Sequence, residues 1–385
     1  MSKHHGQHWD IFCKIVDNYG DIGICWRVSQ QLVNDHHVRV RLFIDDFTTA
    51  KKIIPHLDST QAEQAIQGVT VCAWPTATTA PAEVVIETFS CALPDAYLVQ
   101  MTQQQSIWIN LEYLSAESWV GDFHAKPSPH PTLAITKHFY FPGFKNDTGG
   151  LIREHNLIAR RDTFLNSKID QTKFWQALGI KNDSEKDSIK ISLFCYPQAN
   201  VNQLLLALSA SNQTSSIFLP FNGSIDTLSN IFTDFKLVNA NTLRLRNVTV
   251  YLLPFLSQSD YDHLLWACDL NFVRGEDSWI RAIWASKPFI WQPYIQTEHT
   301  HIKKMRAFLE VYSCEATDEI KSALLDAHLT WSNASVSDTN HLTRLVQNLP
   351  KLRSYARQQA DILSALPDLA TKLLSFSEKL AKNKV

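Results

Sequence analysis

The segment Leu270-Asn-Phe-Val-Arg-Gly-Glu-Asp-Ser-Trp-Ile-Arg-Ala-Ile-Trp-Ala285 has the pattern of a strand, a tight turn and the start of a helix. Its first residues are an apolar run that ends at Arg274-Gly275, where glycine permits a sharp turn. Apolar residues then recur at the i, i+3, i+4 spacing of an amphipathic helix, at Ile280, Ile283 and Trp284. A strand that passes directly into a helix is the repeating step of an α/β domain.

Two interpretations of this junction remain open from its residues alone. A helix N-terminus presents unpaired N–H groups and the positive end of a dipole, so with Arg274 beside it the junction is a candidate anion site. Alternatively, Asp277 or Ser278 only caps the helix and Glu276 is solvated. The two interpretations use the same N–H groups and do not exclude each other.

Outward from this segment, apolar strands alternate with helical patterns on both sides of the polar, glycine-containing loop Lys145–Gly150. Such alternation predicts parallel sheets covered by helices on both faces. In the first half the expected strands are Trp9–Val16, Val38–Ile44, Val69–Trp74, Val84–Phe89, Ser106–Leu111 and Thr132–Ile135. In the second half they are Ile189–Tyr196, Ser216–Phe221, Val248–Leu253, Leu270–Val273 and Phe289–Gln292.

At 385 residues the chain is too long for one ordinary core, so two domains are expected. We expect Rossmann-like domains over residues 1–150 and 151–349, and a helical segment over 350–385 that packs back on the first domain. Two doubly wound α/β halves joined by a hinge would place a ligand cleft between them, at the carboxyl ends of the strands.

Composition limits the classes of function. The 45% hydrophobic and 19% charged content is typical of a globular protein, and a formal charge of −2 gives no overall reason to expect nucleic acid or a membrane surface as a partner. The first residues are polar and no apolar run could span a bilayer, so we expect a cytoplasmic protein. Seven scattered cysteines without C-x-x-C, and histidines without zinc spacing, predict no metal or cofactor.

Carboxylates and aromatic residues follow several predicted strands. Asp17 and Asp21 lie four residues apart in the first loop, where each could be a turn or cap residue or could serve acid/base chemistry. The adjacent pair Asp45-Asp46 opens a predicted helix, which favours capping over metal binding. Further candidates follow later strands, as Glu87-Thr88, Glu112-Tyr113 and the aromatic residues Phe194, Tyr196 and Tyr261, which could stack on a nucleobase or belong to the core.

Five motifs together resemble a known family. They are Asp17-Asn-Tyr-Gly-Asp-Ile-Gly23, Val85-Ile-Glu-Thr-Phe89, Glu112-Tyr-Leu-Ser115, Gly149-Gly-Leu-Ile-Arg153 and Arg274-Gly-Glu-Asp-Ser278. In this order, from about Trp9 to about Phe308, they are similar to the EarP family of protein-arginine rhamnosyltransferases. The resemblance implies a metal-independent, inverting GT-B glycosyltransferase that moves L-rhamnose from dTDP-β-L-rhamnose to an arginine of translation elongation factor P.

The resemblance also implies roles for individual residues. Asp17 and Asp21 match the carboxylates that serve the acceptor arginine, with Asp21 as the base, and Glu276 matches a functionally required glutamate. Positions around the thymine are matched by Phe194, Tyr196, Gln258 and Tyr261, where Tyr261 replaces a phenylalanine. The diphosphate loop is matched by Arg274, Gly275, Asp277 and Ser278, and the ribose contact by Glu298.

The acceptor chemistry agrees with these roles. A guanidinium is protonated at physiological pH, so its nitrogen attacks only as a proton leaves. A carboxylate pair can bind the group by charge-assisted contacts and accept that proton. Two alternatives stay open: a nucleotide-sugar epimerase or hydrolase of the same fold, and a sugar-nucleotide-binding module without chemistry.

Overall fold

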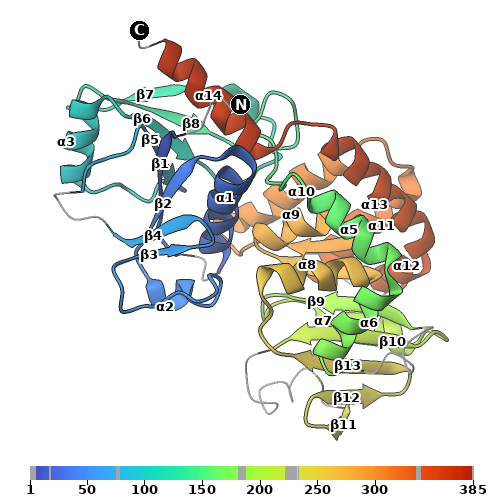
Figure 1. The fold of residues 1–385 in the computed structure, drawn as a ribbon. Coiled ribbons are helices and arrows are strands. Elements are labelled where there is room, and N and C mark those ends of the chain that lie inside the picture. The colour runs from blue at the N-terminus through green and yellow to red at the C-terminus, as the bar shows by residue number, and fades with distance from the viewer. Residues whose placement is uncertain are drawn as a thin grey trace. The chain divides into compact units, whose positions relative to one another are not determined.

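The computed structural model describes residues 6–16, 19–74, 79–180, 188–221, 232, 234–334 and 340–383. Contacts divide the chain into two compact units, each built around its own sheet (Figure 1). Unit 1 consists of Met1–His155 and Ser364–Val385, and unit 2 of Asn156–Leu363. The last helix of the chain therefore belongs to the same unit as the first strand.

The sheet of unit 1 has the strand order β3-β4-β2-β1-β5-β6-β8-β7. The six strands from β4 to β8 run parallel, and the edge strands β3 and β7 pair antiparallel. Unit 1 consists of β1 (His8–Cys13), α1 (Gly20–His36), β2 (Arg39–Ile44), α2 (Phe47–Ala50), β3 (Glu63–Ile66), β4 (Val69–Ala73), β5 (Val84–Thr88), α3 (Asp95–Gln104), β6 (Ile107–Leu111), α4 (Val120–Phe123), β7 (Pro127–Pro129), β8 (Thr136–Tyr140) and α14 (Leu369–Lys382).

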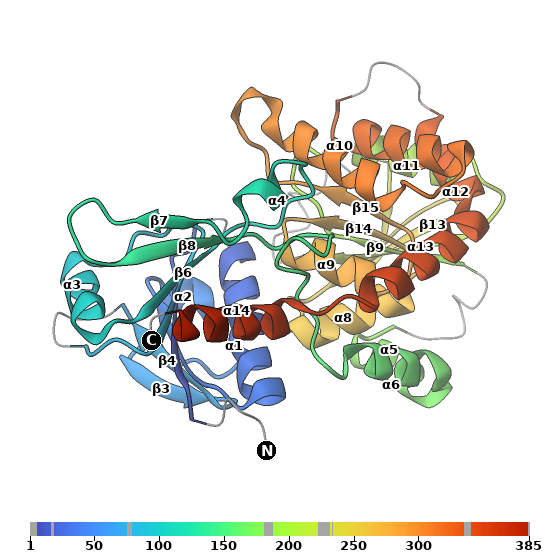
Figure 2. The same cartoon turned by 90° about the horizontal axis from the view of Figure 1, so that it is seen from above.

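Helix α14 is held in unit 1 by the loop that precedes it. It contacts α1 and β6, and both views place it beside α1 (Figures 1 and 2). The Leu369 N–H donates to the Leu151 carbonyl at 2.9 Å, and the Asp368 side chain caps the helix by accepting the Thr371 N–H at 3.0 Å. This capping residue fixes where the returning helix starts.

The sheet of unit 2 has the strand order β11-β12-β13-β10-β9-β14-β15. Its five strands from β13 to β15 run parallel. Unit 2 consists of α5 (Leu157–Asn166), α6 (Lys168–Ala177), β9 (Ile189–Leu193), α7 (Val201–Ser209), β10 (Ser215–Pro220), β11 (Lys236–Asn239), β12 (Thr242–Leu245), β13 (Val248–Leu253), α8 (Gln258–Ala267), β14 (Leu270–Arg274), α9 (Asp277–Trp284), β15 (Phe289–Gln292), η3 (Thr297–His299), α10 (Thr300–Tyr312), α11 (Asp318–Trp331), α12 (His341–Gln347) and α13 (Leu349–Ser364).

A buried ion pair joins two helices of unit 2. The Arg281 guanidinium on α9 donates to both carboxylate oxygens of Asp262 on α8, at 2.9 and 2.6 Å. Both side chains are at most 2% exposed. A two-pronged contact of this kind fixes the orientation of both partners, so it sets how the middle of α8 lies against the middle of α9.

Some expected strands end early, since β1 ends at Cys13 instead of Val16 and β9 at Leu193 instead of Tyr196, and the observed strands differ from the expected ones in two further respects. The expected strand Thr132–Ile135 is wrong: Thr132 to Ala134 form bends, because the His130 imidazole accepts the N–H groups of Thr132 and Leu133, and β8 begins only at Thr136. The antiparallel strands β3, β7 and β11, which form sheet edges, and β12, which lies next to β11, were not expected. Short edge strands carry few apolar residues, so their pattern resembles that of loops.

The fold class is as expected, with two α/β units whose central strands are parallel. Among the helices that the structure describes, none is both long and apolar enough to cross a membrane.

Candidate functional site

In unit 1 the order of the strands reverses at β1, which pairs with β2 on one side and with β5 on the other. The loops that follow β1, β5 and β6 leave the same edge of the sheet, because these strands are parallel neighbours. Open α/β sheets bind ligands at such a reversal, beyond the carboxyl ends of the strands. This edge carries the expected acceptor residues.

Asp21 lies in the first turn of α1, directly after this edge, and is 2% exposed. Its Oδ2 accepts the N–H of Val16 at 2.8 Å, and its Oδ1 accepts the hydroxyl of Tyr113 at 3.1 Å. A buried carboxylate is stabilised when donors satisfy its oxygens, and here the donors come from two separate loops. Asp17, the other expected acceptor residue, lies outside the residues that the structure describes.

The loops after β5 and β6 contribute a pair of stacked rings. Phe89 and Tyr113 lie with ring centres 4.0 Å apart and planes inclined by only 7°. Glu112 is used locally, since its Oε1 accepts from the Ser90 hydroxyl at 3.1 Å and from the Asn110 amide. The sequence singled out both loops without giving Phe89 or Tyr113 a role. An available signal was the position of Phe89 at the end of one predicted strand and of Tyr113 just after the next.

In unit 2 the strand order reverses at β9, which lies between β10 and β14. Phe194 and Tyr196 follow β9, and Arg274 ends β14. The Arg274 guanidinium carbon lies 4.3 Å from the Phe194 ring centre and 4.7 Å from that of Tyr196, and its Nη1 donates to the Cys195 carbonyl at 3.2 Å. The structure thus brings three expected donor residues into one cluster with a cation among aromatic faces.

The turn after Arg274 has the geometry that its glycine allows. Gly275 has φ +64°, its N–H donates to the Gln292 carbonyl at 3.2 Å, and its carbonyl accepts the Trp291 indole N–H at 2.7 Å. Gln292 also accepts the Tyr196 N–H on its side chain at 2.8 Å. The end of β15 therefore fixes both the turn and the aromatic loop, a role that the sequence did not reveal.

The expected capping of α9 by Asp277 or Ser278 is wrong. The residue at the cap position is Glu276, and its side chain makes no capping hydrogen bond. The Ser278 hydroxyl instead accepts the Arg274 N–H at 3.1 Å and donates to the Arg274 carbonyl. Ser278 closes the turn back onto the strand, so it positions Arg274.

Helix α8 adds two further expected residues to this edge. The Gln258 amide donates to Asp277 Oδ2 at 3.2 Å, and the Tyr261 ring meets the Phe194 ring edge-on at 5.6 Å. Burial, and secondly the charge of Asp277, raise the pKa of the Tyr261 hydroxyl well above its usual value. Tyr261 is therefore a neutral aromatic wall at physiological pH, as a phenylalanine would be.

The remaining expected residues are less closely tied to this cluster. Glu276 is partly buried and directly precedes α9. Glu298 is exposed in η3, and within the described chain no hydrogen bond or ring contact links it to the cluster.

Cys195 lies between Phe194 and Tyr196 in the sequence. Burial raises the pKa of its thiol to about 12, so this cysteine holds its proton and is a poor nucleophile at neutral pH.

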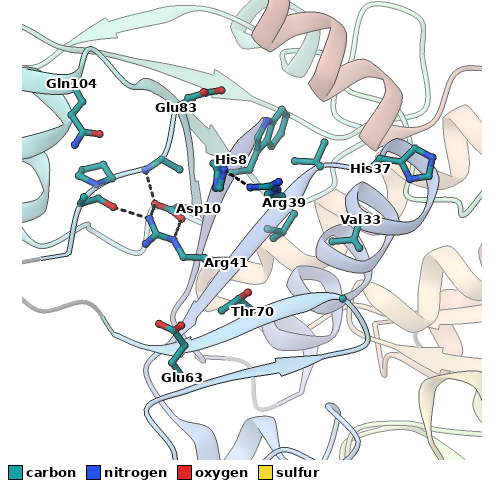
Figure 3. Close-up of a pocket in the computed structure, with 17 residues that line it drawn as sticks. His8, Asp10, Val33, His37, Arg39, Arg41, Glu63, Thr70, Glu83 and Gln104 are labelled. Atoms are coloured by element: carbon teal, nitrogen blue, oxygen red, sulfur yellow. Dashed lines mark hydrogen bonds and ion pairs between the residues drawn. The ribbon is translucent and has the colours of Figure 1, made fainter. Parts of the chain in front are cut away.

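A cavity of about 780 Å³ lies at the other edge of the unit 1 sheet (Figure 3). His8, Arg39 and Glu83 line it at the amino ends of their strands, whereas Asp21 follows a carboxyl end. The buried carboxylate of Asp10 in this cavity accepts hydrogen bonds from Nε and Nη2 of Arg41, each at 2.7 Å, and from the Ala82 N–H at 2.8 Å. These groups satisfy one another, so we regard the network as structural and place the site at the carboxyl edge.

Comparisons with known proteins identify the family of this chain. Residues 9–378 match the family model described as Elongation-Factor P (EF-P) rhamnosyltransferase EarP. A protein-arginine rhamnosyltransferase of Pseudomonas putida is 43% identical over 96% of this chain and 98% of its own length, and one of Pseudomonas aeruginosa is 40% identical with the same coverage. A further protein-arginine rhamnosyltransferase, of Shewanella oneidensis, is 36% identical over 97% of this chain and 98% of its own length.

Solved structures show the same fold. A structure described as the structural basis for EarP-mediated arginine glycosylation of translation elongation factor EF-P matches with a TM-score of 0.68 and 32% identity, over 97% of this chain and 99% of the other. The spinosyn rhamnosyltransferase SpnG matches with a TM-score of 0.52 at 11% identity, over 97% of this chain and all of the other, which concerns the fold alone. The GT-B glycosyltransferase fold with two Rossmann-like domains is confirmed, and the chain belongs to the EarP family of protein-arginine rhamnosyltransferases.

Proposed function

We propose that this enzyme transfers L-rhamnose from dTDP-β-L-rhamnose to an arginine side chain of translation elongation factor P, in the cytoplasm and with inversion at the anomeric carbon. The names of its relatives and the subject of the similar solved structure support the acceptor and the sugar. The observation that carries the proposal is Asp21, a 2% exposed carboxylate held by two hydrogen-bond donors at the carboxyl edge of unit 1.

Asp21 is the general base of the proposed reaction. The acceptor guanidinium gives a proton to Asp21 while its nitrogen forms a bond to the anomeric carbon. The bond from this carbon to the diphosphate oxygen breaks, and its electron pair leaves with dTDP. A carboxylate has room for about four hydrogen bonds, and the Val16 N–H and the Tyr113 hydroxyl fix the direction of the two oxygens that would face the guanidinium. In this proposal Asp17 orients the guanidinium.

The proposed donor site is the cluster at the edge of unit 2. Phe194, Tyr196 and Tyr261 offer ring faces to the thymine, with Gln258 beside them. Base stacking on such faces contributes about 1 to 3 kcal/mol where it occurs. The ribose contact would come from Glu298.

The leaving diphosphate is stabilised by fixed positive groups in this proposal. Arg274 supplies a cation, and the backbone N–H groups of Asp277 and Ser278 lie at the start of α9, just after the turn that Gly275 forms. Because a cation and a helix start are already present, we propose that catalysis needs no metal ion or cofactor. Glu276, next to this loop, is proposed to hold a hydroxyl of the sugar.

The test is a transfer assay. The purified protein is incubated with dTDP-β-L-rhamnose and elongation factor P, with and without a chelator, and intact-mass spectrometry measures the acceptor. We expect an increase of one deoxyhexose, insensitive to chelation and absent from an acceptor that lacks its target arginine. Donor breakdown without an acceptor, at a rate matching any transfer, would instead indicate an epimerase or hydrolase. Binding of both partners without a mass change would indicate a binding module.

A further inference from the structure

Asp21 is held from two sides by groups of different origin. The Val16 N–H belongs to the loop of Asp21 itself, whereas the Tyr113 hydroxyl comes from the loop after β6. The backbone donor reaches Oδ2 and the hydroxyl reaches Oδ1, so each carboxylate oxygen has its own donor. The direction of the carboxylate therefore depends on where the Tyr113 hydroxyl lies.

The position of this hydroxyl depends in turn on Phe89. The Tyr113 ring lies flat on the Phe89 ring, at 4.0 Å between centres and 7° between planes. Tyr113 is 37% exposed, so the protein interior surrounds it only in part. The stacking on Phe89 therefore restricts the rotation of the partly exposed Tyr113 ring.

Phe89 is presented by a backbone turn of unusual conformation. Phe89 and Ser90 both have φ +54°, and Ala92 has φ +60°. Left-handed backbone conformations of non-glycine residues are strained and persist only where the surroundings hold them. Here the Phe89 N–H donates to the Leu111 carbonyl at 2.7 Å and the Ser90 N–H donates to Asn110 Oδ1 at 3.1 Å.

We infer that Tyr113 is a positioning residue for the base Asp21, and that Phe89 acts through Tyr113. This inference rests on the proposed function, because it assigns the pair to the step in which Asp21 takes the proton of the acceptor arginine. The chain of contacts runs from the strained turn after β5, through the stacked rings, to one carboxylate oxygen.

The first test is Tyr113→Phe, which keeps the ring and removes the hydroxyl. We expect kcat for transfer to fall about tenfold, while the KM for both substrates and the Kd for dTDP change less than about twofold. A wild-type kcat in this variant would overturn the inference. Tyr355→Phe is the matched control, because the Tyr355 hydroxyl donates to the Tyr312 carbonyl of unit 2, at 2.7 Å, and its loss should leave kcat unchanged.

A double-mutant cycle tests the role of Phe89. Phe89→Leu should lower kcat at least about threefold in the wild-type background but less than about 1.5-fold in Tyr113→Phe, because Phe89 acts through the missing hydroxyl. Equal losses in both backgrounds would overturn this part. Thermal unfolding of each variant separates loss of fold from loss of position. If the wild-type enzyme transfers no rhamnose, the proposed function and this inference fail together; if it does, the variants decide the inference alone.

Discussion

The guanidinium carbon of Arg274 lies 4.3 Å from the centre of the Phe194 ring, and no carboxylate in the described chain forms an ion pair with this arginine. The Ser278 hydroxyl holds the backbone of Arg274 from both its N–H and its carbonyl. An arginine with a fixed backbone and no carboxylate partner keeps its charge available for an anion. This geometry is the basis for assigning Arg274 to the diphosphate.

Replacing Arg274 should weaken donor binding. Arg274→Met removes the cation, and we expect the Kd for dTDP to rise at least about tenfold, since a hydrogen bond to a charged group contributes roughly 1.5 to 3 kcal/mol. Arg274→Lys should lie between this variant and the wild type, because lysine keeps the charge but not the planar fork. Isothermal titration with dTDP measures both. Arg353→Met, which removes a half-exposed arginine paired with Asp269, is the control, and an unchanged Kd in Arg274→Met would refute the assignment.

Much of this region was predictable from its sequence, and the limits are physical. The strand, turn and helix around Arg274 were expected, because apolar periodicity and a turn glycine are local signals. The prediction that Ser278 caps α9 was wrong because its hydroxyl forms hydrogen bonds with the N–H and the carbonyl of Arg274, and not with the N–H groups of its own helix. Which of several polar groups a hydroxyl bonds depends on tertiary geometry that a one-dimensional pattern lacks.

The buried His328 should make stability depend on pH. Its Nε2 accepts the backbone N–H of Trp291 at 3.1 Å, and burial lowers the pKa of His328 to about 4 from its usual value. In the unfolded chain this histidine takes up a proton near pH 6.5. Its neutral form therefore contributes fully to the free energy of unfolding above pH 6.5. This contribution, roughly 3 kcal/mol in all, is lost as the pH falls towards 4. Chemical denaturation between pH 7 and pH 4.5 should show the loss.

A non-titrating replacement isolates this group. His328→Gln should flatten the decline in unfolding free energy between these pH values, although His124, whose pKa burial also lowers to about 4, contributes with the same sign. The same decline in His328→Gln as in the wild type would show that His328 is not its source. His328 contacts the backbone of Trp291, and the indole N–H of Trp291 donates to the carbonyl of Gly275 in the turn of the proposed donor site. The Kd for dTDP is therefore a second quantity to measure on His328→Gln.

The ion pair of Asp262 and Arg281 should be costly to break. Asp262→Ala leaves the guanidinium buried without its partner, and we expect a loss of about 3 to 5 kcal/mol in unfolding free energy. The double variant Asp262→Leu/Arg281→Met, which removes both charges, should lose less. Urea unfolding measures both, and a single variant more stable than the double variant would contradict this account of the pair.

The acceptor edge shows what the sequence could not provide. The loop of Asp21 and the motifs around Phe89 and Tyr113 were recognisable, because each follows an apolar strand. That β5 and β6 are neighbours, and that Phe89 has a left-handed backbone, follow only from the folded sheet. The strand expected to end at Phe89 ends at Thr88 for this reason. The ring stack that orients Tyr113 could not be inferred before these neighbours were known.

The central claim is that Asp21 takes the proton of the acceptor arginine, and Asp21→Asn tests it most directly. The measurement is the single-turnover rate of rhamnose transfer to elongation factor P, with dTDP affinity determined on the same preparation. Asp45→Asn is the matched control, because Asp45 accepts the Ile15 N–H at 3.0 Å in the same region and has no assigned chemical role. We predict that Asp21→Asn transfers at least about a hundredfold more slowly with unchanged dTDP affinity, whereas transfer at the wild-type rate would contradict the account.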